Sequence, residues 1–167
     1  MQDALTLYFN GEKYAGLLLA GMAFAALVAS AVMWRAGSPL RPFSTTVGFF
    51  ALAEIALGGG LYLRTGPQVN RLDEQLRSDP QSFYSSEAAR MRRVQRNFVI
   101  VEYVEVVIIV TAAIAALSLK SRSGPAGVAL GLLINASVVF AFDVFAERRG
   151  AEYVSALAGA AVCGDPT

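Results

Sequence analysis

Four stretches of the chain, each 21 or 22 residues long, are almost entirely apolar. They cover residues 14–34, 43–63, 98–119 and 126–146, and the first contains no charged residue. A helix rises about 1.5 Å per residue and so needs about 20 apolar residues to cross the ~30 Å hydrocarbon core of a bilayer. Within lipid, a helix satisfies its own backbone hydrogen bonds. The sequence therefore predicts one all-α domain over residues 1–167, an integral membrane four-helix bundle.

The composition agrees with a membrane protein and excludes several kinds of chemistry. Hydrophobic residues make up 55% of the chain and charged residues 16%, against about 25% charged residues in soluble domains. Histidine is absent and Cys163 is the single cysteine, which excludes an internal disulfide, His-ligated haem, the usual zinc centres and a Ser-His-Asp triad. We expect no cofactor, and only a hard cation bound by carboxylates stays open as a metal. The net charge of +1 does not suggest a nucleic-acid partner.

The connections between the spans differ in length. Residues 35–42 and 120–125 are rich in Gly, Ser and Pro and predict two tight hairpins on one side of the membrane. We expect a long extramembrane loop over residues 64–97, with a short helix near 69–76 and a break at Asp79-Pro80. The third helix should begin near Ser86 and run through its span. Residues 147–167 are expected to form a C-terminal tail, and residues 1–13 a short interfacial segment.

The distribution of basic residues predicts the orientation. The two hairpins carry four of the 14 Lys and Arg residues, and the opposite side carries the other ten. Basic residues are enriched in cytoplasmic loops. We therefore expect the termini and residues 64–97 to lie in the cytoplasm.

Four carboxylates lie inside the apolar stretches, namely Glu54, Glu102, Glu105 and Asp143. Each costs ~2.5–3.5 kcal/mol or more at the bilayer centre and should face the bundle interior or a wet cavity. Glu54 is the deepest, roughly 14 Å from the side of residues 64–97, and the other three lie in the same half of the membrane. Glu102 and Glu105 share a helix face because they are three residues apart. Together with Asn135, these groups form a candidate ion or proton site.

Arginines near the membrane surface offer a structural alternative for two of these carboxylates. Arg90, Arg92, Arg93 and Arg96 precede the third span, and Arg148 and Arg149 follow the fourth. Long arginine side chains can reach back into the membrane, so Glu102 and Asp143 could be neutralised by ion pairs. The four arginines of the 90–96 run could also contact anionic lipid headgroups or serve only to set topology.

Small residues indicate close contacts between helices. Gly127 and Gly131 form a GxxxG pair, Gly16, Ala20 and Gly21 form a small-residue stripe, and three glycines follow one another at 58–60. Small side chains let helix backbones approach each other in a membrane. Contact within the bundle and contact between copies explain these patterns equally well.

The sequence supports three functional hypotheses. The first is a transporter or channel that handles a cation or proton through the intramembrane carboxylates, as a homo-oligomer because four short spans enclose little space. The second is a non-catalytic accessory or scaffold subunit of a larger membrane complex, with the carboxylates as buried pairing groups. The third, an enzyme acting on lipid, lacks a recognisable nucleophile or metal signature. We expect a bundle sealed on the hairpin side and open on the side of residues 64–97.

Overall fold

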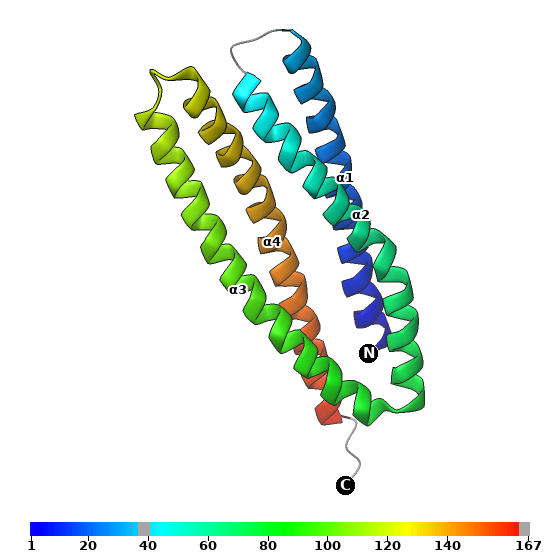
Figure 1. Ribbon diagram of the computed structural model, residues 1–167. Coiled ribbons are helices and arrows are strands. Elements are labelled where there is room, and N and C mark those ends of the chain that lie inside the picture. Colours follow the sequence, from blue (N-terminus) through cyan, green and yellow to red (C-terminus); the bar gives the residue numbers. More distant parts are fainter. Residues whose placement is uncertain (37–40, 164–167) are drawn as a thin grey trace.

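The computed structural model describes residues 1–36 and 41–163, and these form an all-α four-helix bundle (Figure 1). The helices are α1 (Gln2–Arg35), α2 (Arg41–Ser78), α3 (Pro80–Ser118) and α4 (Ser123–Cys163). Each is long and apolar enough to cross a membrane. Between 11% and 17% of the residues in the most apolar part of each helix are buried within the bundle, so the remaining apolar side chains are available to lipid. The predicted all-α bundle of four apolar helices is confirmed.

Residues 64–97 are almost entirely helical where a loop was predicted, whereas the predicted break at Asp79-Pro80 and the extension of the third helix beyond its apolar stretch are both present. α2 continues to Ser78, and Asp79 alone separates it from α3, which begins at Pro80. The Asp79 side chain accepts a hydrogen bond of 3.0 Å from the backbone N–H of Ser82 and so caps α3. Proline suits the first turn of a helix because it has no N–H to leave unbonded there. The polar residues after position 63 mark where the chain leaves the apolar layer of the membrane. They do not end the helix, which continues beyond this layer.

The predicted C-terminal tail is also largely helical. α4 passes through Gly150 and reaches Cys163. The last predicted tail residues, 164–167, and the centre of the first hairpin, 37–40, lie outside the described residues. The start of α1, the end of α4 and the α2–α3 turn therefore belong to one extramembrane layer of helix ends, at the bottom of Figure 1.

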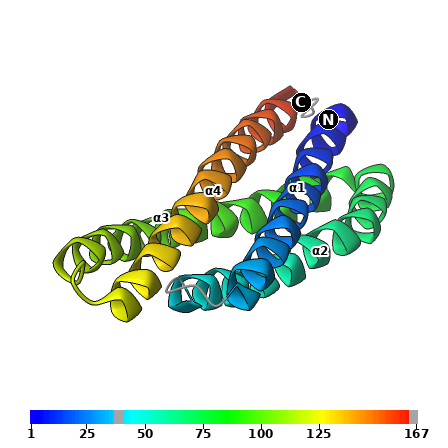
Figure 2. The same cartoon turned by 90° about the horizontal axis from the view of Figure 1, so that it is seen from above.

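The bundle consists of two antiparallel helix pairs. α1 packs along α2, α3 packs along α4, and the pairs meet mainly where α2 contacts α4. Figures 1 and 2 show the two pairs side by side, and Figure 1 shows the α2–α3 turn at the opposite end from the α3–α4 turn. Among the described helices, the backbones of α1 and α3 do not approach each other closely, and these two helices meet only through side chains at the extramembrane end. The α2–α4 contact is therefore the main link between the two pairs inside the membrane.

Buried positions recur every seven residues along the helices. They include Phe9, Gly16, Ala23 and Ser30 on α1, Ser44, Ala51, Gly58, Thr65 and Leu72 on α2, and Ala129, Ala136, Gly150 and Leu157 on α4. A seven-residue repeat is slightly shorter than two helical turns, and it makes helices wind around each other with a left-handed twist. Most of these positions carry small residues, so the helices lie close together.

The closest contact between α1 and α2 is made by two glycines. A Cβ atom on Gly16 would lie 2.8 Å from the carbonyl oxygen of Gly58, and one on Gly58 would meet the backbone of α1. Gly127 and Gly131 of the GxxxG pair pack within the bundle, against Phe43 at the start of α2. Gly21, Gly59 and Gly60 face open space. Contact within one copy therefore accounts for the GxxxG pair and for Gly58.

Replacing Gly58 by alanine should destabilise the bundle. The added methyl group meets the backbone of α1, and overpacking of this kind costs about 1–3 kcal/mol. Gly59→Ala is the matched control, because it adds the same atom where nothing lies within 4 Å and improves helix propensity by about 1 kcal/mol. Denaturant unfolding in detergent, followed by circular dichroism, measures both. Equal stability of the two variants would contradict this close approach.

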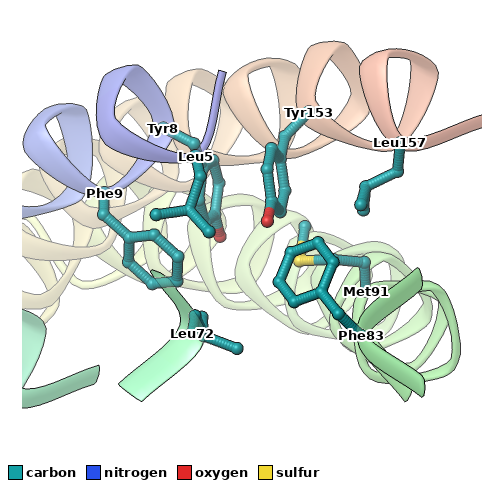
Figure 3. Packing of buried hydrophobic residues seen from close by; sticks show 8 residues of the cluster. All are labelled: Leu5, Tyr8, Phe9, Leu72, Phe83, Met91, Tyr153 and Leu157. Carbon is teal, nitrogen blue, oxygen red and sulfur yellow. The ribbon is translucent and has the colours of Figure 1, made fainter. Parts of the chain in front are cut away.

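The extramembrane end has a hydrophobic core to which all four helices contribute (Figure 3). It consists of Leu5, Tyr8, Phe9, Leu72, Phe83, Met91, Tyr153 and Leu157. The rings of Tyr8 and Tyr153 stack with centroids 4.8 Å apart and planes 9° from parallel. Apolar side chains that would otherwise face water pack together here, so they fill the centre of this end of the bundle.

An ion pair lies within this core. The carboxylate of Glu87, 2% exposed, accepts hydrogen bonds from Nε and Nη2 of Arg90 at 2.7 and 2.6 Å. The guanidinium also lies over the ring of Phe9, 5.6 Å from its centroid. Burial alone would lower the pKa of Arg90, but the hydrogen bonds and charge of Glu87 raise it above its usual value. Arg90 therefore stays charged, and it connects α3 to α1.

Loss of Arg90 should destabilise this end of the bundle much more than loss of an exposed arginine on the same helix. Arg90→Ala leaves the carboxylate of Glu87 buried without a counter-charge, which costs about 3 kcal/mol. Arg92→Ala is the control, since Arg92 is exposed and its loss should change stability by less than about 0.5 kcal/mol. Unfolding midpoints in detergent report both values. Equal stability of Arg90→Ala and Arg92→Ala would show that the Glu87–Arg90 pair does not stabilise this end of the bundle.

Candidate functional site

Glu54 pairs with Asn135 at mid-depth in the bundle. Glu54 is 7% exposed on α2, and Nδ2 of Asn135 on α4 donates a hydrogen bond of 2.8 Å to its Oε1. Glu54 lies one helical turn before Gly58, so it shares the inner side of α2 with the close helix contact. The hydrogen bond links the two helix pairs where α2 meets α4. Glu54 thus has a neutral partner and no counter-charge from Asn135.

Glu105 on α3 faces Asp143 on α4, within hydrogen-bonding reach. Glu105 is 7% exposed and Asp143 is half-buried. Two ionised carboxylates have acceptors only, and Oε2 of Glu105 is in fact buried without a partner. A single proton placed between the two groups would supply the missing donor. The arrangement can therefore bind a proton.

Glu102 lies near this pair, on the side toward the extramembrane end. Its carboxylate is close to Asp143 and to Glu147 on α4, and its Oε1 is buried without a hydrogen-bond partner. Glu102 also lines a groove of about 290 Å³, whose other residues include Tyr103 and Phe140. Glu147, Glu102, Asp143 and Glu105 thus form an acidic row that leads from the membrane surface inward along α3 and α4.

The acidic groups do not converge on one point. Asn135 and Asp143 are eight residues apart on α4, about 12 Å along the helix axis, so the Glu54 pair is separate from the Glu105 pair. Within residues 1–36 and 41–163, no group of three or more Asp, Glu or Cys side chains is placed to hold a metal ion. The structure thus contains two separate acidic sites along α4.

Arginines do not neutralise the acidic row in the part of the chain that the structure describes. The ion pairs found there are Arg77–Asp73 and Arg90–Glu87, and neither involves Glu102 or Asp143. Arg90 belongs to the extramembrane core. The remaining arginines of the run, Arg92, Arg93 and Arg96, are exposed on α3.

Sequence reasoning missed the groups that make up the extramembrane core. Tyr8 donates a hydrogen bond of 2.5 Å to Oε1 of Glu12, and burial together with nearby carboxylates raises the pKa of Tyr8 and of Tyr153. Both hydroxyls therefore stay protonated at physiological pH. Phe9, Gly16 and Ala23 are spaced seven residues apart, and this repeat begins before the apolar stretch. The repeat indicates that the helix starts earlier than the stretch and keeps the same side toward the bundle.

The fold and its acidic sites define a class: a four-helix membrane bundle with carboxyl groups buried between its helices. The chain matches no family model, no curated protein and no solved structure. Its function is therefore inferred from the geometry of the sites.

The hydrogen bond between Glu54 and Asn135 predicts a coupling between the two residues. Glu54→Leu, Asn135→Leu and the double variant should give a coupling free energy of about 0.5–1.5 kcal/mol, the usual size for hydrogen bonds between membrane helices. Ser137→Ala paired with Glu54→Leu is the control, because Ser137 bonds to the carbonyl of Leu133 on its own helix. Unfolding in detergent measures each variant, and a coupling no larger than that of the control would refute the contact.

Proposed function

We propose that this protein transfers protons across the membrane, with the Glu105–Asp143 pair as the proton-binding site. The observation that carries the proposal is the placement of two carboxyl groups face to face, with no donor to Oε2 of Glu105 among the described residues. A buried carboxyl pair favours holding one proton, because two negative charges at short range repel strongly where the dielectric constant is low.

The acidic row supports a route to this site. Glu147 and Glu102 lie between the membrane surface and the Asp143–Glu105 pair, and the groove beside Glu102 gives access from outside the α3–α4 pair. Carboxyl groups in such a series can exchange protons directly or through water. The free oxygens of Glu102 and Glu105 suit hydrogen bonding to water or to a proton in transit.

The Glu54–Asn135 pair continues the route where α4 faces α2. It lies deeper than the acidic row, and buried hydroxyl groups follow at Ser44 on α2 and Ser30 on α1, toward the hairpins. Hydroxyl groups both donate and accept hydrogen bonds and can complete a relay through water. Protons must then pass from Glu105 to Glu54 around α4. Because these two sites are separate, this step requires either a movement of the helices or water between the sites.

Orientation and assembly are part of the same proposal. The extramembrane core would lie in the cytoplasm, because ten of the 14 Lys and Arg residues belong to that side. A homo-oligomer is the expected functional unit, because the four helices pack in two pairs around small residues that leave little internal space for a pore.

Proton flux into liposomes tests the proposal. Purified protein is reconstituted with a pH-sensitive dye inside the vesicles, and a potassium gradient with valinomycin drives proton entry. Wild-type vesicles should acidify faster than protein-free vesicles, and Glu105→Gln should reduce the added rate at least about tenfold, since general acid–base groups contribute 10²–10⁴ to proton transfer rates. Glu74→Gln is the control, because Glu74 is exposed outside the membrane segment.

Two outcomes would overturn the proposal. One is a wild-type rate equal to that of protein-free vesicles, which would favour an accessory subunit. The other is a wild-type rate in Glu105→Gln, with the variant folded by circular dichroism.

A further inference from the structure

A groove of about 650 Å³ lies between α1 and α4 at the extramembrane end, outside the acidic sites. Tyr8 and Tyr153 are among its lining residues, and Tyr14, the first residue of the apolar stretch of α1, also lines it. The groove is mostly apolar, and it also contains Arg149. A guanidinium in such a place, close to the membrane surface, is a candidate anion-binding group.

Arg149 is held against α1 by a glycine. A Cβ atom on Gly11 would lie 2.7 Å from Cδ of Arg149 and 3.1 Å from its Nε, so the side chain lies across the backbone of α1. Its Nε is buried and has no hydrogen-bond partner. Glu152 lines the same groove, yet no ion pair joins it to Arg149 within the described residues. Because α1 covers Nε, an acceptor in the groove can reach the guanidinium only through its terminal nitrogens, which are not among the buried atoms without a partner.

A second groove continues from the first into the membrane. It runs along the outer surface of α1 from Tyr14 past Leu17 and Gly21 to Ala25, has a volume of about 640 Å³, and shares Tyr14 with the first groove. No atom of a neighbouring side chain lies within 4 Å of the place where a Cβ of Gly21 would be. Tyr14 and Ala25 are eleven positions apart, about 16 Å along the helix axis, which is close to the ~15 Å of one leaflet's hydrocarbon. The second groove therefore has the length of one acyl chain.

We propose that the two grooves together bind one anionic glycerophospholipid, with its phosphate on Arg149 and an acyl chain along α1 from Tyr14 to Ala25. Guanidinium groups bind phosphate through paired, charge-assisted hydrogen bonds, and basic pockets between membrane helices bind lipid headgroups. Tyr14 lies where the two grooves meet, which is the depth at which tyrosine is enriched in membrane proteins. The apolar second groove distinguishes a lipid from free phosphate, because an inorganic ion makes no use of it.

Native mass spectrometry of the full chain in a neutral detergent tests the proposal. Added phosphatidylglycerol should give a complex with one bound lipid, and Arg149→Gln should weaken this binding about tenfold, as expected for loss of a charge-assisted contact. Gly11→Val keeps the charge but displaces the arginine, and Gly21→Leu fills the second groove where there is space for a side chain. Both should weaken lipid binding, whereas Arg92→Gln removes an exposed arginine of α3 and should leave the binding unchanged.

A second experiment uses inorganic phosphate to distinguish a bound lipid from a bound free anion. Phosphate at millimolar concentration should neither bind stably nor displace the lipid. The proposal is overturned if Arg149→Gln binds phosphatidylglycerol as wild type does, or if Arg92→Gln loses as much binding as Arg149→Gln, which would indicate general surface charge. Displacement of the lipid by phosphate alone, or unchanged binding in Gly21→Leu, would show that the acyl chain does not occupy the second groove. Circular dichroism confirms that each variant is folded.

Discussion

The close approach of α1 and α2 at Gly16 and Gly58 sets the position of the groups that α2 carries. Helices in lipid gain little from burying apolar surface, so their association depends on close packing and on hydrogen bonds. With α2 held against α1 by its small residues, Glu54 lies one turn away and faces α4, where Asn135 meets it. The seven-residue repeat continues this packing along the helices, and the carboxyl groups lie where the pairs of helices adjoin.

The extramembrane end and the membrane part of the bundle are stabilised by different interactions. Outside the lipid, the hydrophobic effect drives Leu5, Phe9, Phe83 and Met91 into a core, and the Glu87–Arg90 pair adds a charged contact within it. Inside the lipid, small residues and two polar pairs connect the helices. This division lets the membrane part hold carboxyl groups without arginine partners, because the extramembrane core contributes stability that does not depend on them.

The acidic row and the groove that contains Arg149 lie on different sides of α4, and each supports a separate proposal. Glu102, Glu105 and Asp143 lie between α3 and α4, whereas Arg149 lies against Gly11 of α1. Sequence reasoning identified all four intramembrane carboxylates and Asn135 from their residue types in apolar stretches. It assigned the arginines by their proximity in sequence to the membrane, and so it did not separate Arg90, which is in the core, from Arg92, which is exposed.

The sequence by itself determined the four apolar helices, their antiparallel order, and the depth of the carboxyl groups, because these depend on hydropathy and on the rise of a helix. Only the tertiary structure decided where the helices end, since a helix can continue into water when its inner side meets other helices, as α2 and α3 do up to Asp79. The tertiary structure also decided which polar side chains contact each other between the helices. Glu54 and Asn135 are 81 residues apart in the chain, and their contact depends on how α2 and α4 pack, which no local pattern specifies.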